Sequence, residues 1–187
     1  SALGANGIAV SAIIATHAAA AMGAIAWCGA EWAHRGKPTV LGVASGAVAG
    51  LATVTPAAGY IAPMSAIAIG LVAGMTCYAA IVWKGRFGYD DSLDVVGIHG
   101  VGGVIGILAT GLFASKVVNP GGADGLFFGN PGLFGIQLLV AAVTTIFSII
   151  GTFVILKLVD SMTGLRVSSE EEATGLDLSQ HNERAYS

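Results

Sequence analysis

The chain has 187 residues, of which 55% are apolar and only 10% are charged, and its formal net charge at pH 7 is −3. An ordinary soluble domain carries about 25% charged residues, and a single core of this size cannot bury so much apolar helix. The composition therefore excludes an ordinary soluble domain and favours a membrane protein with several spans. The sequence has no basic arm that would indicate a nucleic-acid partner.

Five long apolar runs account for this composition. The opening residues, SALGANG, lack an initiator methionine and lead directly into the first run, so we expect the chain to be part of a longer protein. At about 1.5 Å per residue, each run is long enough to cross a hydrocarbon layer of about 30 Å. We predict an all-α polytopic membrane protein with a transmembrane bundle over residues 1–165 and a polar cytoplasmic tail over residues 166–187. The five predicted spans are residues 8–32, 39–60, 62–83, 93–114 and 133–158.

Two features of the early runs concern helix packing. Small residues recur at a spacing of four, as in Gly42, Gly46 and Gly50. In a membrane such faces let helix backbones approach closely, which indicates a tight bundle and says nothing about a ligand. Pro56, late in the second run, either kinks that helix or ends it.

The basic residues fall on one side of the predicted topology. Loops 33–38 and 84–91 and the segment from residue 157 onward share that side, and the other side holds only Lys116. Because Lys and Arg concentrate on the cytoplasmic side of membrane proteins, we predict an outside start and a cytoplasmic tail in the cell membrane. The basic residues on the predicted cytoplasmic side are Arg35, Lys37, Lys84, Arg86, Lys157, Arg166 and Arg184.

The segment DDSLDVVGIHGVGGVIG, residues 90–106, places acidic residues and a histidine at the start of the fourth run. In a regular helix, Asp91 and His99 lie about 12 Å apart along the axis and about 80° apart around it, so His99 is expected well inside the membrane on the side of Asp91. An ionisable side chain inside a membrane marks a functional site, although a histidine bonded to a neighbouring helix is the alternative. For Asp91 and Asp94 the alternative is a structural role at the helix N-terminus, where carboxylates offset the macrodipole.

The remaining candidates point to structure rather than chemistry. His17, in ATHAAAA, is the other histidine within a predicted span, and its alanine surroundings favour a packing or hydrogen-bonding role. No two histidines have the spacing of metal ligands, and Cys28 and Cys77 lie in apolar runs as buried thiols. We therefore expect no metal, no cofactor and no enzymatic activity.

Several motifs resemble those of ammonium transporters, in the same order and over nearly the whole chain. DDSLDVVGIHGVGGVIG followed by GLFAS is similar to a late membrane-helix motif of that family, as are the stretches GLATVTPAAGY, AEWAHRGKP, MTGLRV and GLDLSQHNERAY to other segments. The resemblance implies an eleven-helix bundle of two inverted repeats, assembled as a homotrimer with a narrow pore in each subunit. The spans predicted here resemble the seventh to the eleventh, so the N-terminal half of the same protein is an expected partner.

The resemblance also assigns roles to individual residues. His99 matches the second of two histidines that face each other in the family's pore, and Ser1 matches a serine near the outer recruitment site. Asp91 and Asp94 match acidic residues at the inner end of the histidine-bearing helix. Val95 is an apolar residue of the kind expected to line such a pore.

A histidine in an apolar pore suits the transport of ammonium across a lipid membrane. Ammonium and potassium have similar size and charge, but only ammonium can give up a proton and so avoid the cost of carrying a bare ion through an apolar tube. A neutral imidazole both donates and accepts hydrogen bonds, and an unperturbed one titrates near neutral pH. We therefore predict transport of ammonium or ammonia. The alternatives are an ammonium sensor built on the same fold and a purely structural membrane bundle.

The polar tail is predicted to regulate transport on the cytoplasmic face, with a merely solvated tail as the alternative. By resemblance, it packs on the neighbouring subunit, and PII-type signalling proteins dock on the same face. Ser179 falls where plant relatives carry a phosphorylated threonine, and a phosphate would add about −1.5 to −2 charges to an acidic segment. The other tail residues assigned to this role are Gly175, Asp177 and Tyr186.

The predicted orientation can be tested by labelling intact cells. A single cysteine introduced at Asn119 should react with a membrane-impermeant thiol reagent, whereas one at Gln180 should react only after the membrane is opened. The reason is the concentration of basic residues on the side that holds Gln180. Labelling of Gln180→Cys alone in intact cells would reverse the assignment.

Overall fold

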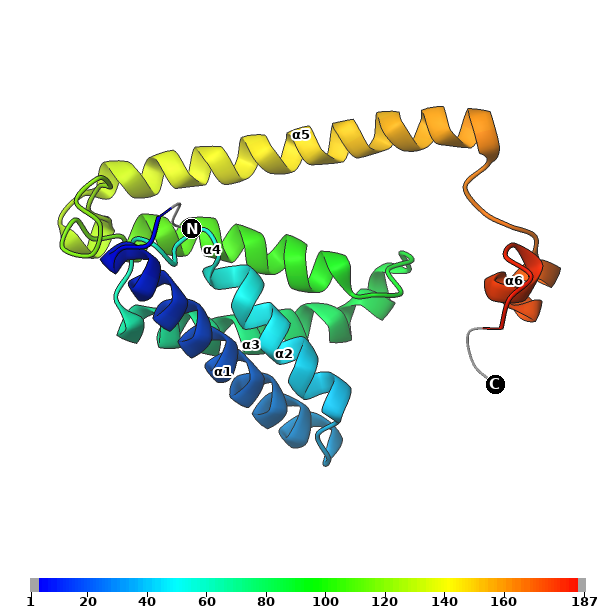
Figure 1. Cartoon of the computed structure of the whole chain (residues 1–187), viewed down its shortest axis with the longest axis horizontal. Coiled ribbons are helices and arrows are strands. Elements are labelled where there is room, and N and C mark those ends of the chain that lie inside the picture. The colour runs from blue at the N-terminus through cyan, green and yellow to red at the C-terminus, as the bar shows by residue number, and fades with distance from the viewer. Residues whose placement is uncertain (1–3, 185–187) are drawn as a thin grey trace. The chain divides into compact units, whose positions relative to one another are not determined.

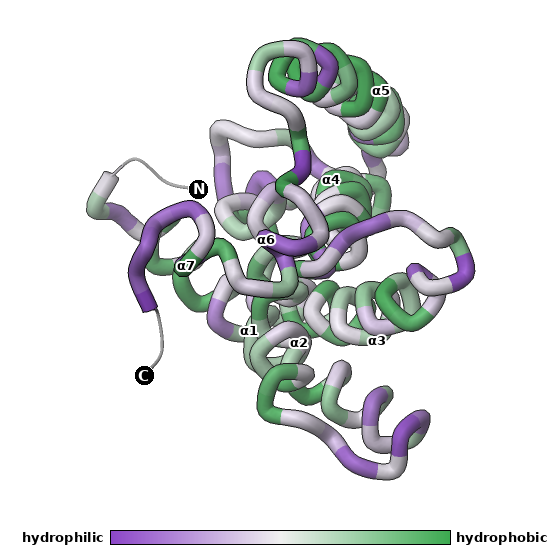
Figure 2. Tube along the Cα trace, turned by 90° about the vertical axis from the view of Figure 1, so that its right-hand side faces the viewer, coloured by the Kyte–Doolittle hydropathy of each residue, from purple (hydrophilic) through white to green (hydrophobic). Residues whose placement is uncertain are grey.

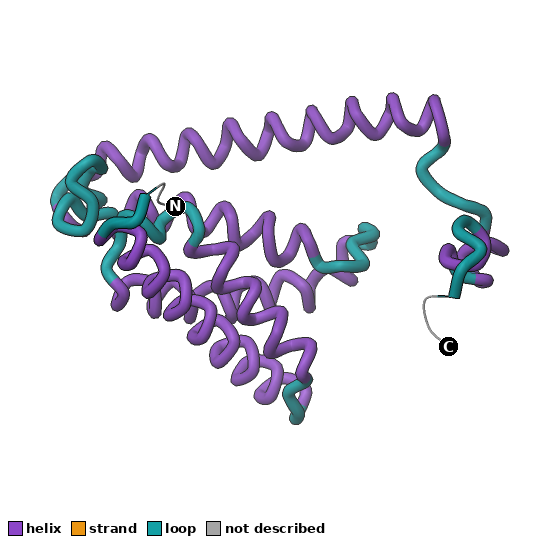
Figure 3. Tube along the Cα trace, in the orientation of Figure 1, coloured by secondary structure: helices purple, strands orange, loops and turns teal. Residues whose placement is uncertain are grey.

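The computed structural model describes residues 4–184, and all of its regular elements are helical, with no strand in that range (Figure 3). This finding confirms the predicted all-α class. The chain divides into two compact units, one ending at Ala142 and the other beginning at Val143. The elements in chain order (Figure 1) are α1 (Gly7–Arg35), α2 (Val40–Val54), α3 (Pro63–Phe87), the π-helix η1 (Val96–Gly100), α4 (Val101–Phe113), the 3-10 helix η2 (Leu126–Phe128), α5 (Pro131–Thr163), α6 (Ser169–Thr174) and α7 (Leu176–Ser179).

Four of the described helical segments are long and apolar enough to cross a membrane. They are α1, α3, α5 and the continuous segment Val96–Phe113 formed by η1 and α4. Helix α2 is equally apolar but has only 15 residues. Hydrophobic residues follow these helices along the chain, whereas hydrophilic residues gather in the connections and in α6 and α7 (Figure 2).

Helix α2 is shorter than the predicted span 39–60 because it ends at Val54. Pro56 has no N–H group and cannot continue the helical hydrogen-bond pattern. The N–H groups of Ala57 and Ala58 instead both turn back to the carbonyl of Val54, at 2.9 Å each. Of the two outcomes considered for Pro56, the structure shows a helix end rather than a kink.

Helices α1, α2 and α3 pack against one another through residues that have little or no side chain. A Cβ atom at Gly50 would lie 2.8 Å from the carbonyl carbon of Ala19, and one at Gly70 would lie 2.9 Å from the Cα atom of the same alanine. Atoms this close would overlap, so α2 and α3 both lie directly on the backbone of α1. Ala19 and Ala49 are accordingly fully buried. This is the close helix packing that the glycine spacing predicted.

The connections of the first unit lie at two opposite ends, as expected for helices that cross in alternating directions. At one end, His34 Nδ1 near the end of α1 lies 2.7 Å from the hydroxyl of Tyr78, which lies within α3. At the other end, the linker between α2 and α3 meets the loop after α4, where the N–H of Ser115 donates to the carbonyl of Tyr60 at 2.8 Å.

The second unit holds the rest of α5 and the polar tail with α6 and α7. Apolar side chains of α5 are exposed here, for example Phe147 and Ile149. A continuous exposed apolar surface of this kind suits contact with lipid or with another protein chain.

Packing through Gly50 can be tested by adding one methyl group. In the full-length protein that contains this segment, Gly50→Ala should lower the free energy of unfolding in detergent by about 1–3 kcal/mol, as overpacking of a tight contact does. Gly85→Ala in α3 is the matched control, because a Cβ atom there meets nothing within 4 Å. Equal stability of the two variants would show that the backbones can separate without loss.

Candidate functional site

The histidine predicted to be functional lies in a π-helical turn, η1, directly before α4. The N–H of Val101 bonds to the carbonyl of Val96, five residues back, which is the pattern of a widened turn. Single π turns within α-helices are frequent at functional sites. Because Asp91 precedes the helix and residues 96–100 form a π turn, the 80° angle expected between Asp91 and His99 in a regular helix does not apply here.

His99 and Val95 are both exposed in the described chain, and Val95 retains 49% of its accessible surface. They are separated by four residues, about one helical turn, and so share a face. The opposite side of this turn faces the bundle, since Gly97 and Ile98 are buried. The structure thus presents an imidazole and an apolar side chain together on a membrane-spanning segment.

Asp91 lies just before the helix rather than on it. Its carboxylate accepts hydrogen bonds from the N–H groups of Val95 at 2.8 Å and Val96 at 3.0 Å. These are N–H groups that the first helical turn leaves without a partner inside the helix, and a carboxylate there also offsets the helix macrodipole. The contacts of Asp91 therefore match the structural alternative that the sequence left open.

Asp94 is held by Lys84, a lysine that the sequence pattern marks only as a basic loop residue. Lys84 Nζ forms an ion pair with the carboxylate of Asp94 and also donates to the carbonyl of Asp91 at 2.6 Å. Asp94 has a φ of 57°, a left-handed conformation that Asp adopts more readily than most residues. One side chain of α3 therefore contacts both acidic residues at the start of the histidine-bearing segment.

Glu31 is a second structural residue that sequence reasoning missed. Its side chain is 4% exposed, and its carboxylate accepts from the N–H of Thr39 at 3.1 Å and from the hydroxyl of Thr39 at 3.2 Å. Arg35 Nη1 lies 3.8 Å away and is largely exposed, so this pair contributes little beyond the hydrogen bonds. An acidic residue near the end of an otherwise apolar run was the available signal.

The other predicted residues lie apart from this site or outside the description. His17 is exposed on α1, and Ser1 and Tyr186 fall outside the described residues. Within residues 4–184, no three His, Cys, Asp or Glu side chains gather as metal ligands would.

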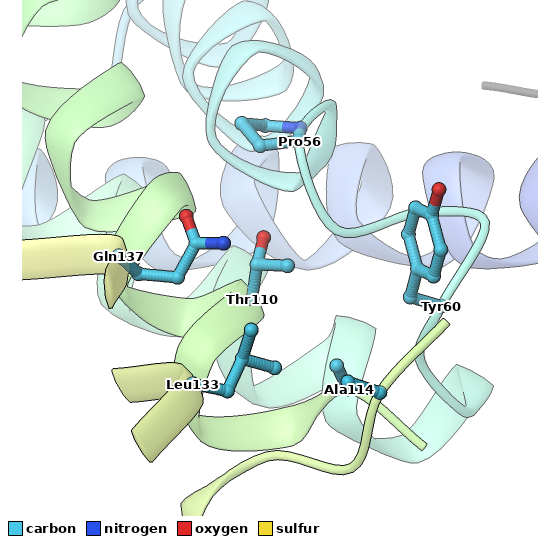
Figure 4. Close-up of a pocket in the computed structure, with 7 residues that line it drawn as sticks. Pro56, Tyr60, Thr110, Ala114, Leu133 and Gln137 are labelled. Carbon is cyan, nitrogen blue, oxygen red and sulfur yellow. The ribbon is translucent and has the colours of Figure 1, made fainter. Parts of the chain in front are cut away.

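A pocket of about 240 Å³ lies toward the other end of α4, where α2 ends and α5 begins (Figure 4). It is lined by Pro56, Tyr60, Thr110, Ala114, Ala123, Leu133 and Gln137, and it does not include His99.

The tail residues belong to a small folded segment built around Glu171. The hydroxyl and N–H of Ser168 both donate to the Glu171 carboxylate, at 2.8 and 2.9 Å, and Gln180 Nε2 donates to it at 2.8 Å. Hydrogen bonds from Ser168 hold the pKa of Glu171 below its ordinary value. Gly175, with a φ of 99°, joins α6 to α7, and the hydroxyl of Ser179 donates to its carbonyl at 2.9 Å. Asp177 lies in the first turn of α7.

Comparison with known proteins identifies relatives over the whole chain. A family model described as Ammonium Transporter Family matches residues 1–186. The ammonium transporter of Bacillus subtilis (strain 168) is 49% identical over 187 residues, which cover 100% of this chain and 46% of the relative. The crystal structure of Saccharomyces cerevisiae Mep2 superposes with a TM-score of 0.83 at 34% identity, covering 89% of this chain and 39% of Mep2.

A solved structure described as Sensor Amt Protein superposes equally well, with a TM-score of 0.82 at 27% identity. It covers 94% of this chain and 43% of that protein. The chain therefore spans about half the length of the proteins it matches.

The role of Glu171 predicts how the tail responds to acid. The pKa of Glu171 is lower in the folded segment than in the unfolded chain. The ionised carboxylate therefore stabilises α6 at pH values above the unfolded pKa, and this stabilisation is lost as the pH falls through the folded pKa. NMR signals of the Glu171 and Gly175 amides should therefore move toward disordered positions on acidification below about pH 4. Glu171→Gln should lack this step, and an unchanged step in that variant would assign it to another group.

Proposed function

Since the chain belongs to the ammonium transporter family, we propose that it supplies one wall of a pore through which ammonium or ammonia crosses a membrane. The observation that carries this proposal is the exposure of His99 and Val95 on one face of a membrane-spanning segment. An uncovered imidazole in such a segment is costly unless another part of the protein or a water-filled path meets it. The N-terminal half of the same protein is the partner that this face needs.

The pore discriminates by chemistry rather than by size. A cation that keeps its charge must lose its hydration shell to pass Val95, and an apolar wall offers no polar groups that would offset this desolvation. Ammonium can give its proton to water at the entrance and cross as neutral ammonia, whereas potassium has no proton to lose. The ring of His99 supplies both a donor and an acceptor, so it can bond to ammonia without adding a fixed charge to the path.

Asp91 supports the site by fixing where the histidine-bearing helix starts. Its two hydrogen bonds, to the N–H groups of Val95 and Val96, lie within the first turn below His99. Asp94 and Lys84 neutralise each other beside it. In this proposal the acidic residues are structural, and His99 and Val95 are the residues that face the permeating molecule. Ser1 would contribute to recruitment on the outer side.

The complete protein is proposed to be a homotrimer in the cell membrane with the tail in the cytoplasm. The exposed apolar side chains of α1 and α5, such as Ile13 and Phe147, then contact lipid or neighbouring helices. The folded segment around Glu171 would regulate transport, and the proposed partner on this face is a PII-type protein. A phosphate on Ser179 would bring negative charge to a hydroxyl that lies 3.5 Å from the carbonyl oxygen of Glu171 and would loosen the segment. Transport unchanged by removal of all residues after Leu165 would contradict a regulatory role.

A sensor is the second candidate function. The similarity to the Sensor Amt Protein favours it, since the fold agrees as well with that protein as with Mep2. A sensor requires ammonium binding that changes the state of a cytoplasmic partner, and it does not require rapid permeation. Measured flux per trimer therefore separates the two candidates.

The central prediction concerns His99 in the full-length protein. His99→Ala removes the donor and acceptor from the apolar path and should lower ammonium and methylammonium transport at least about 100-fold, a loss typical of a misplaced reacting group. His99→Glu should instead pass cations with reduced discrimination against potassium, because a fixed negative charge offsets the desolvation of an ion that keeps its proton. Ammonium-dependent current and potassium uptake in proteoliposomes measure both effects.

His17→Ala is the control for this experiment. His17 is also an exposed histidine in a span, and its alanine surroundings predict a packing role rather than a place in the pore. It should leave selectivity unchanged. Wild-type flux and selectivity in His99→Ala would reduce His99 to a packing residue and remove the basis of the proposal.

A further inference from the structure

We infer that one face of α3, formed by Cys77, Ile81 and Lys84, positions His99 by holding the π turn η1 in place. The three residues follow one another at spacings of four and three, so they lie in a row along the helix. Each contacts a different part of the segment from Asp91 to Ile98. The inference rests on the proposed function, because it concerns the direction in which His99 faces the pore.

Lys84 fixes the entry to the turn. Its ammonium group bonds to the Asp94 carboxylate and to the Asp91 carbonyl, and both charged side chains are at least two-thirds buried, at 24% and 31% exposure. At this depth water screens the pair less than on an open surface, so the attraction is stronger than for an ordinary surface ion pair. Lys84 thereby also holds the backbone of Asp91, whose carboxylate caps the helix at Val95 and Val96.

Ile81 supports the middle of the turn. A Cβ atom at Gly97 would lie 2.7 Å from Cγ1 of Ile81, so the turn rests on this side chain with no room for a larger residue. The contact fixes the distance between α3 and the backbone two residues before His99.

Cys77 contacts the inner side of the same turn. Its fully buried thiol lies 3.8 Å from the carbonyl of Ile98, the residue directly before His99, and donates a weak hydrogen bond to it. Thr53 is also fully buried, and its hydroxyl has no hydrogen-bond partner among the described residues. A Cβ atom at Gly102 would lie 2.7 Å from that hydroxyl and 3.5 Å from the thiol, so both side chains border the first turn of α4.

These contacts matter because the same residues could instead form a regular α-helical turn. Conversion of the turn to α geometry shifts the chain by one residue, which rotates a side chain by about 100° around the axis. Helix α4 is fixed by its glycines against α2, where a Cβ atom at Gly106 would lie 3.0 Å from the carbonyl carbon of Thr53. The rotation would therefore fall on the segment that carries Val95 and His99, and both side chains would turn by about 100° away from the direction in which they now face.

The experiment compares Lys84→Met with Lys84→Arg in the full-length transporter, with amounts normalised to protein recovered as monodisperse material from the membrane. Lys84→Met keeps the length of the side chain and removes its charge. It should lower the selectivity for ammonium over potassium by about tenfold or more, because a displacement of about 1 Å at a reacting group can cost about 100-fold. Lys84→Arg should restore most of the selectivity. Lys37→Met, a basic residue at the same end of the bundle, is the control and should change nothing.

A second measurement reports the direction of residue 99 without relying on transport. In a Cys28→Ser background, His99→Cys is labelled with a thiol reagent, with and without Lys84→Met. The buried Cys77 serves as the unlabelled background. The inference requires the labelling rate to change at least about threefold with Lys84→Met and to return with Lys84→Arg. If Lys84→Met yields no stable protein, Asp94→Asn removes the same ion pair from the other side and should give the same change.

The outcomes separate the two proposals. No ammonium transport by the wild-type protein would overturn the proposed function and leave the labelling result to decide on positioning. Wild-type selectivity together with unchanged labelling in Lys84→Met would overturn the positioning role. Reduced transport with unchanged labelling would also overturn it, because the effect of Lys84 would then not pass through the direction of His99.

Discussion

The direct contact of helix backbones in the first unit is the constraint on which the site depends. Between apolar helices in lipid there is no hydrophobic drive for association, so close packing and hydrogen bonds must hold them together. Ala19 shows how this is achieved, since Gly50 of α2 and Gly70 of α3 both approach its backbone. With α2 and α3 fixed in this way, α4 is held by Gly102 and Gly106 against Thr53, and this packing places the helix that follows the π turn of His99.

The sequence predicted the parts of the fold that depend on composition and spacing. Hydropathy alone indicated the all-α class and the approximate positions of the helices, and the repeated glycines indicated where the helices meet. The sequence also marked His99 as the candidate functional residue, because an ionisable residue in an apolar run is rare, and this assignment stays a prediction. Pro56 marked the place where α2 stops, but only the hydrogen bonds of Ala57 and Ala58 to Val54 show that the helix ends rather than bends.

What the sequence did not predict depends on contacts between separate helices. The predicted angle between Asp91 and His99 was wrong because residues 96–100 form a π turn, and nothing in the segment DDSLDVVGIHG indicates such a turn. Lys84 looked like one of several cytoplasmic basic residues, and its pairing with Asp94 follows from α3 and η1 lying side by side. The role of Glu31 was likewise not predicted, because its burial depends on the start of α2, which packs over it.

The Glu31–Thr39 contact has a consequence for how the protein is made. The two residues are separated by eight positions, so the hairpin of α1 and α2 can close before α3 has been synthesised. Contacts between near neighbours form early because little chain entropy is lost in closing so short a loop. The buried carboxylate thus finds its hydrogen-bond donors within the first two helices, and this pair can enter the bilayer as one unit while the ribosome is still extending the chain.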